Sequence, residues 1–390
     1  MTSLQIDFTG LTQWIGQTLS DYLSPGWALT VELILAALAL IVMIVVLVIL
    51  MIYAERKIAG FMQLRLGPMR VGWCGSVQAI ADVLKLLLKE CVTPFKADKF
   101  LFALAPFIVL TTSFLALVPF SYSPGLQLWD INIGVLYITA VSSISVIGVM
   151  MAGWASNNKY SLLGAMRSGA QIVSYELSVG MSLIAVIAMS GSLSILDIIN
   201  SQADGWWIYK GHIPAIISFM IFIIASTAEL NRAPFDLAEA EQELTAGFHT
   251  EYSGMQFAMF FLSEYTNMLI ASMMAATVFF GGWQPLYIPG LDGFNAVMDY
   301  IPGFIWFFGK VFFVVFLMEK TSFGYKVRVT GINSAFAKNA GIKTGKIILT
   351  ASFISGLIAG MGGAVEMVGM YKRFQWQTSV NYVWDGLMVH

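Results

Sequence analysis

Acidic side chains gather in one stretch of the chain, at a spacing that suits proton chemistry. Between positions 229 and 251 there is a single basic residue, Arg232, against Glu229, Asp236, Glu239, Glu241, Glu243 and Glu251. Asp236, Glu239 and Glu243 recur three and four positions apart, so a helix would stack them on one face. Like charges that close raise one another's proton affinity, and such a row can hold and pass protons. A solvated acidic loop is the alternative, but apolar side chains interleave the acids and favour a segment folded back into protein: Phe235, Leu237, Leu244 and Phe248.

A second stretch, residues 53–68, mixes charged and apolar side chains directly after a long apolar run. Its polar members are Glu55, Arg56, Lys57, Gln63 and Arg65. The mixture suits a short helix lying in the membrane interface, where it could form a rim for an amphiphile entering from the lipid. The alternative is that the charged residues only end the apolar segment, with Arg and Lys reaching the headgroups. Farther along, Asp82 and Lys85, and Lys85 and Lys89, have the spacing of one helix face.

Single ionisable residues also fall within or beside the apolar runs. They are Glu32, Glu176, Glu264, Lys310 and Glu366. Ionisable groups are costly in hydrocarbon and are functional by default. Glu176 and Glu264 are the deepest by position, whereas Glu32 begins its run and could reach the surface.

Several kinds of chemistry are excluded by what the sequence lacks. The two cysteines stand 17 positions apart, which excludes a disulfide scaffold and a cysteine-ligated cluster. The three histidines are scattered, so we expect no metal site. There is no Walker A sequence and no GxGxxG after a strand. A net charge of -2 argues against binding nucleic acid.

Composition indicates that these residues are positioned by membrane helices. The chain of 390 residues is 58% hydrophobic and 11% charged, far less charged than a soluble protein. Runs long enough to cross a bilayer predict about eight spans in an all-α polytopic membrane protein, near residues 27–53, 101–120, 131–154, 172–190, 212–228, 254–280, 302–318 and 347–370. Residues 1–26 contain no Lys or Arg, so we expect no cleaved signal and an external N-terminal segment.

The distribution of basic residues predicts the orientation. The connections 54–100, 155–171, 229–253 and 319–346 hold seventeen Lys and Arg, and those on the other side hold one. Positively charged loops stay inside, so both termini are expected outside.

Three long motifs carry a family resemblance. They are AERKIAGFMQLRLGPMRVGWCGSVQAIADVLKLLLKE at 54–90, GWASNNKYSLLGAMRSGAQIVSYEL at 153–177 and AELNRAPFDLAEAEQELTAGFHTEYSGMQFAMFFLSEYTNM at 228–268. Residues 27–318 closely resemble the H subunit of bacterial respiratory complex I, which is equivalent to mitochondrial subunit 1. One departure is Leu230, where that family usually has Thr.

The resemblance implies a membrane subunit of a proton-pumping NADH-quinone oxidoreductase in the bacterial inner membrane. It implies quinone as substrate, bound near Glu55, Arg56, Lys57, Gln63 and Arg65. It also implies a proton relay through Glu176, Glu229, Arg232, Asp236, Glu239, Glu241, Glu243 and Glu264. No cofactor is expected in this chain, while iron–sulfur clusters and FMN are expected in partner subunits. The implied partners are hydrophilic quinone-site and iron–sulfur subunits, and small membrane subunits alongside.

The C-terminal segment, residues 319–390, does not fit this resemblance. It looks instead like the permease of a nucleoside or simple-sugar ABC importer, on Gly324, Tyr325, Arg328, Asn333 and Gly341. An artefact joining two genes is favoured over a natural fusion or an unusual genuine tail.

Three functions remain open at this point. The first is quinone reduction coupled to proton translocation, and the second is the equivalent subunit of an ion-pumping hydrogenase or ferredoxin-linked complex. The third, a solute permease working with ATPases, depends on residues 319–374 alone. Iron–sulfur, nickel-containing or ATP-binding partners would distinguish them.

Overall fold

The protein is built almost entirely from helices. The computed structural model describes residues 14, 16–18, 21, 24–63, 65–232, 235, 245–287, 295, 298–320, 345 and 349. Within them the helices are α2 (Pro25–Met62), α3 (Gln78–Leu88), α4 (Lys99–Leu115), α5 (Gly134–Ala155), α6 (Lys159–Ser190), α7 (Ile195–Asn200), α8 (Trp207–Lys210), α9 (His212–Glu229), α11 (Gly254–Phe280) and α13 (Gly303–Lys320), with 3-10 turns η1 (Trp73–Gly75) and η2 (Gly247–His249). The strands β1 (Ser121–Ser123) and β2 (Leu126–Gln127) form a small antiparallel pair. The expected all-α class is confirmed.

Four of the described helices are long and apolar enough to cross a membrane. They are Gly26–Phe61, Gly134–Ala155, Lys159–Ser190 and His212–Glu229. At a rise of 1.5 Å per residue, the 22 residues of α5 measure about 33 Å, which matches the hydrocarbon core. Two shorter apolar helices lie at Lys99–Leu115 and Gly303–Met318. The chain is thus a membrane protein with several apolar helices.

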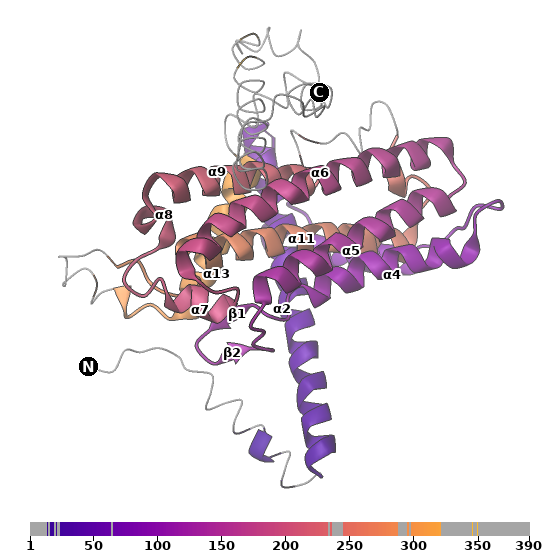
Figure 1. Cartoon of the computed structure of the whole chain (residues 1–390). Coiled ribbons are helices and arrows are strands. Elements are labelled where there is room, and N and C mark those ends of the chain that lie inside the picture. Colours follow the sequence, from indigo (N-terminus) through magenta and orange to yellow (C-terminus); the bar gives the residue numbers. More distant parts are fainter. Residues whose placement is uncertain are drawn as a thin grey trace.

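The helices pack into one bundle crossed by α2. Pairwise packing joins α4 to α5, α5 to α6 and α6 to α9, while α11 packs against α4 and α13. Figure 1 shows α4, α5, α6 and α11 running roughly side by side, with α2 crossing them at a steep angle. The interior helix is α11, whose second half is almost wholly buried. Its first half carries Glu264, whose side chain is 27% exposed.

Short polar and glycine signals fix the ends and contacts of these helices. Asp98 caps α4 by accepting hydrogen bonds from the backbone N–H groups of Phe100 and Leu101. Gly148 brings α5 against α4, because a Cβ at this position would collide with the Val109 side chain. Such close approach through small residues is typical of membrane helices.

Seven of the eight predicted spans coincide with helices, with differences at their ends. The span predicted at 347–370 falls outside the described residues apart from position 349. No separate helix follows span one, because α2 continues through Met62: Glu, Arg and Lys are good helix formers and do not end it. Helix α6 begins at Lys159, so much of the predicted connection 155–171 is helical. Small residues such as Gly164 and Ser168 are buried there, and hydropathy does not register them.

Candidate functional site

An Arg-centred cluster joins three helices near the C-terminal end of α2. Arg232, just beyond α9, places its Nε 3.0 Å from a carboxylate oxygen of Glu264 on α11. Its Nη1 lies 3.6 Å from Glu55 of α2, and its guanidinium stacks over the Tyr265 ring at 4.6 Å. Tyr265 donates its hydroxyl hydrogen to Glu55 at 2.5 Å. We call Glu55, Arg232, Glu264 and Tyr265 the Arg232 cluster.

Two carboxylates share one guanidinium in the Arg232 cluster. The Arg232 side chain is 19% exposed, and the two glutamates are 27% exposed each. Charges this far from water interact more strongly than surface pairs. The cluster therefore links α2 to α11 through charged side chains.

The turn after α9, which carries Arg232, is held by two amide side chains. Gln171 of α6 donates from Nε2 to the carbonyls of Ala228 and Phe235, at 2.7 and 2.6 Å. Asn231 donates to the Ser168 hydroxyl at 2.9 Å. Asn231 has φ 50°, a left-handed conformation that Asn tolerates better than most residues. These contacts aim Arg232 into the bundle.

The charged residues next to Glu55 point elsewhere. Arg56 forms an ion pair with Asp82 of α3, which also accepts a hydrogen bond from Gln78 at 3.1 Å. Burial alone would raise the pKa of Asp82, but the hydrogen bonds from Arg56 and Gln78 outweigh it and hold the pKa below its usual value. On the helix face that Asp82 shares with Lys85, it is thus Asp82 that pairs with Arg56. Helix α3 is fastened to the end of α2 by this pair.

The remaining three predicted quinone residues lie along the segment after α2. Lys57 donates to the Pro68 carbonyl at 2.6 Å and so folds this segment back on the helix. Gly60 permits the fold, since a Cβ there would come within 2.9 Å of the Gly67 backbone nitrogen. Arg65 donates to Gln63 at 2.6 Å, and both side chains are exposed. The structure therefore brings Glu55 together with the relay residues and leaves Gln63 and Arg65 at the surface.

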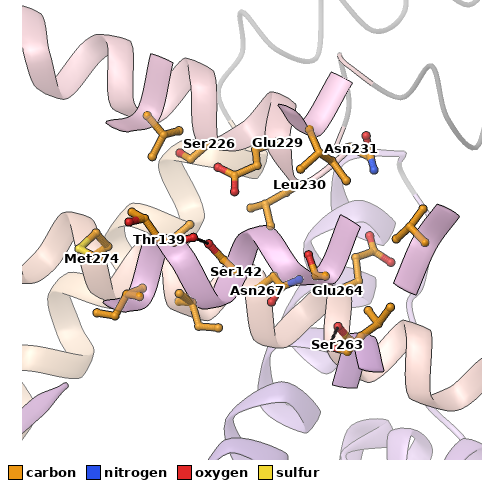
Figure 2. Close-up of a pocket in the computed structure, with 18 of the residues that line it drawn as sticks. Thr139, Ser142, Ser226, Glu229, Leu230, Asn231, Ser263, Glu264, Asn267 and Met274 are labelled. Atoms are coloured by element: carbon orange, nitrogen blue, oxygen red, sulfur yellow. Dashed lines mark hydrogen bonds between the residues drawn. The ribbon is translucent and has the colours of Figure 1, made fainter. Parts of the chain in front are cut away.

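A cavity of about 120 Å³ lies between α5, α6, α9 and α11. Glu229, the last residue of α9, points into it, and Glu264 lines the same space (Figure 2). The polar part of the wall consists of Thr139, Ser142, Ser145, Ser226, Glu229, Asn231, Ser263, Glu264 and Asn267. Two carboxyl groups, several hydroxyls and two amides thus face a cavity whose wall is otherwise apolar.

Most hydroxyls of this wall donate to their own helix. Ser142 donates to the Thr139 carbonyl at 2.9 Å, and Ser226 donates to the Phe222 carbonyl at 2.6 Å. A hydroxyl has one hydrogen and two lone pairs, so these groups present acceptors to the cavity. They can therefore accept a hydrogen bond from water or from a protonated carboxyl.

Glu176 lies on α6, near this cavity and apart from the Arg232 cluster. It accepts a hydrogen bond from Ser143 of α5. Its charge interacts with that of Glu229, which is half-buried at the end of α9. Glu176 and Glu229 thus form a second acidic pair.

The acidic row predicted at Asp236, Glu239, Glu241 and Glu243 lies outside the described residues. Beyond it, Glu251 accepts a hydrogen bond at 2.6 Å from Asn158, the residue that caps α6. His249 in η2 is held neutral because burial lowers its pKa to about 4. Among the described residues no group of three or more His, Cys, Asp or Glu side chains could hold a metal ion.

Sequence reasoning missed several residues that the structure brings to the site. Tyr265 follows Glu264 directly, and its aromatic ring could have been proposed as an Arg partner. Nothing in the spacing pointed to Ser143 or Gln171, because their partners are far away in sequence. Lys310, expected to be functional, is buried and donates to the carbonyls of Phe280, Gly282 and Gln284 at 2.6, 2.8 and 2.5 Å. Its observed partners make it a cap on the end of α11.

Known proteins are similar to this chain over most of its described helices. The chain matches the model of the NADH dehydrogenase family over residues 35–330. It is 56% identical over 312 residues to the H subunit of NADH-quinone oxidoreductase from Bacteroides thetaiotaomicron, covering 80% of this chain and 87% of the relative. The equivalent protein of Brevibacillus brevis is 47% identical over 294 residues, covering 75% and 84% respectively. That of Rhodospirillum centenum is 46% identical over 298 residues, covering 76% and 84%.

These matches correct one expectation and establish another. The family match runs to residue 330, past the boundary at 318 that the permease resemblance suggested. The interpretation of residues 319–390 as a permease fragment joined to the chain is not borne out. The first relatives are matched over most of their length, at identities far above what chance similarity gives. The chain therefore belongs to the NADH dehydrogenase family, together with the H subunits of NADH-quinone oxidoreductase.

Proposed function

We propose that this chain is the membrane subunit of an NADH-quinone oxidoreductase, where it helps to form the quinone site and couples quinone reduction to proton translocation. The subunit role is supported by the relatives, which are named as the H subunit of NADH-quinone oxidoreductase at 46–57% identity. The coupling role depends on one observation, the Arg232 cluster. It ties the end of α2, where the charged rim begins, to Glu264 on the wall of the acidic cavity.

The quinone side of the proposal consists of the end of α2 and the segment after it. Glu55 and Arg56 are the charged groups nearest the bundle, and Lys57, Gln63 and Arg65 extend the rim outward. Quinone headgroups carry two carbonyl oxygens that accept hydrogen bonds, and Arg and Lys are donors only. A headgroup reaching the Arg232 cluster would compete with Glu55 for Arg232 and for the Tyr265 hydroxyl.

The relay side begins where the cluster meets the cavity. A change in the charge around Glu55 alters the field at Glu264, which lines the same cavity as Glu229. From Glu229 the next carboxyl group is Glu176, with which it interacts. Asp236, Glu239, Glu241 and Glu243 belong to the same proposed relay from their position in the sequence.

The chain is proposed to act in an assembly that supplies the redox groups. Electrons would come from iron–sulfur clusters and FMN in hydrophilic partner subunits, and small membrane subunits would lie alongside. The excess of Lys and Arg in the loops that include α3 favours an inner membrane orientation with the N-terminus outside.

The test is a pair of measurements on the assembled complex in inverted membrane vesicles. A photoreactive quinone should label peptides from the last residues of α2 to Arg65, that is, residues 54–65. Glu229→Gln should abolish NADH-driven proton uptake while NADH oxidation by an artificial electron acceptor continues. Absence of label from this chain in an active complex would refute the quinone role, and normal proton uptake in Glu229→Gln would refute the relay.

A further inference from the structure

Ser143 stands at a branch point between two hydrogen-bond acceptors. From α5 its hydroxyl lies 2.8 Å from the Thr139 carbonyl one turn earlier, and it also contacts a carboxyl oxygen of Glu176 on α6. A serine hydroxyl has one hydrogen, so it can donate to only one of these oxygens at a time. Which one receives the hydrogen depends on the charge of Glu176.

Each protonation state of Glu176 has a complete set of hydrogen bonds with Ser143. A charged carboxylate only accepts, so the Ser143 hydrogen turns toward Glu176 and stabilises the charge. When Glu176 takes up a proton, its own O–H donates to the Ser143 oxygen. The Ser143 hydrogen then turns to the Thr139 carbonyl, and no donor is left without an acceptor.

We propose that Ser143 is a positioning residue for Glu176, whose hydroxyl rotates between Glu176 and the Thr139 carbonyl as Glu176 loses and gains its proton. The inference rests on the proposed function, in which Glu176 belongs to the proton relay. The Ser143 hydroxyl is the group that keeps the Glu176 carboxyl in one place, whether that carboxyl is charged or protonated. Proton transfer needs that constancy because its rate depends strongly on the distance and alignment of donor and acceptor.

Neighbouring hydroxyls do not have this arrangement. Ser142 and Thr139 donate to carbonyls of α5 itself. Ser174, on the same helix as Glu176, donates to the Ala170 carbonyl and is exposed. Ser143 is half-buried between α5 and α6, where a bond to a charged group is stronger than in water. The charge that acts on Glu176 from α9 is that of Glu229.

The experiment compares four variants of the assembled complex in inverted vesicles. Ser143→Ala removes the hydroxyl, Ser143→Thr keeps it, Ser174→Ala is the matched control, and Glu176→Gln removes the carboxyl group. NADH-driven proton uptake should fall about tenfold in Ser143→Ala and recover in Ser143→Thr, because a hydrogen bond to a charged group is lost and then restored. Ser174→Ala should pump like the unmodified complex.

Infrared difference spectra report on the hydrogen bond of Glu176 directly, because the carbonyl stretching frequency depends on that bond and not on packing elsewhere. The carbonyl stretch that disappears in Glu176→Gln belongs to protonated Glu176. It should shift to higher wavenumber in Ser143→Ala and keep its position in Ser143→Thr and Ser174→Ala. If Ser143→Ala does not assemble, Ser143→Cys nearly retains the size but offers protonated Glu176 a weaker hydrogen-bond acceptor, and the band should shift partway.

The two ideas fail separately. Normal proton uptake in Glu176→Gln would overturn the relay role of Glu176 in the proposed function. Slow uptake in Glu176→Gln with normal uptake and an unshifted band in Ser143→Ala would overturn the role of Ser143 alone. Equally slow Ser143→Ala and Ser143→Thr complexes would also overturn it.

Discussion

Replacing Arg232 with Gln should remove the ion pairs that link Glu55 on α2 to Glu264, which lines the cavity. The guanidinium of Arg232 lies 3.0 Å from Glu264 and 3.6 Å from Glu55, and it stacks on Tyr265. The substitution Arg232→Gln would keep a polar side chain of moderate length without the charge. The two carboxylates would then repel each other with no cation between them.

The size of the effect follows from distance and burial. At an effective dielectric constant of about 20, two unit charges 3.0 to 3.6 Å apart attract by about 5 kcal/mol. Desolvation and the repulsion between the carboxylates offset most of this. Removing one partner of a fully buried pair costs about 3–5 kcal/mol, but side chains 19–27% exposed lose less, about 2 kcal/mol. That free energy corresponds to about a 30-fold change in rate.

The assay is NADH-driven quinone reduction by the assembled complex. Arg232→Gln should be about 30-fold slower, while oxidation of NADH by an artificial acceptor stays normal. Adding Glu264→Gln should restore part of the rate, because the surplus negative charge is then gone. Full activity of Arg232→Gln would refute the reasoning, as would a double variant whose loss is the sum of the two single losses.

Three further outcomes can be measured independently. Asp82→Asn should abolish a pH-dependent stabilisation of α3. Because the pKa of Asp82 is lowered, this residue stabilises the folded protein above the unfolded pKa of about 3.9, and the stabilisation is lost as the pH falls below that value. Amide hydrogen exchange of α3 at different pH values measures the effect. Lys310→Met should lower the free energy of unfolding, measured by thermal denaturation, by about 3 kcal/mol, because three buried carbonyls lose their hydrogen-bond donor. The control, Lys210→Met at the surface, should change it by less than about 0.5 kcal/mol. Ser24→Cys, with both native cysteines replaced by Ser, should react with a membrane-impermeant maleimide added to intact cells, and reaction only in inverted vesicles would reverse the orientation.

The sequence predicted the helices well because lipid imposes a length and a composition on each span. The runs near α5, α9 and α11 were found within a few residues for this reason. Hydropathy failed where helices continue beyond the hydrocarbon. It ended the first span at residue 53 and began α6 at residue 172. Charged and small residues look like loops on a hydropathy scale, although they are compatible with helix.

The site was only partly predictable, because spacing along the chain does not give contacts between helices. Glu55 and Glu264 were both singled out, but their shared partner Arg232 could be assigned only once three helices were packed together. Lys310 shows the opposite case. A lone lysine in an apolar run predicts function, yet three carbonyls at the end of α11 satisfy its donors. Those acceptors come from the chain's own backbone, which residue types do not reveal.

Lys310 holds one end of α11 in place, so any tilt of this helix moves its other end most. The helix is clamped where Lys310 binds the carbonyls of Phe280, Gly282 and Gln284, and Glu264 lies about 24 Å away along its axis. A tilt of about 5° around the clamp would displace Glu264 by about 2 Å over that length. That is enough to open a contact of 3.0 Å to Arg232 beyond hydrogen-bonding range. A small rotation of one buried helix can therefore break the ion pair while the Lys310 end of that helix stays in place.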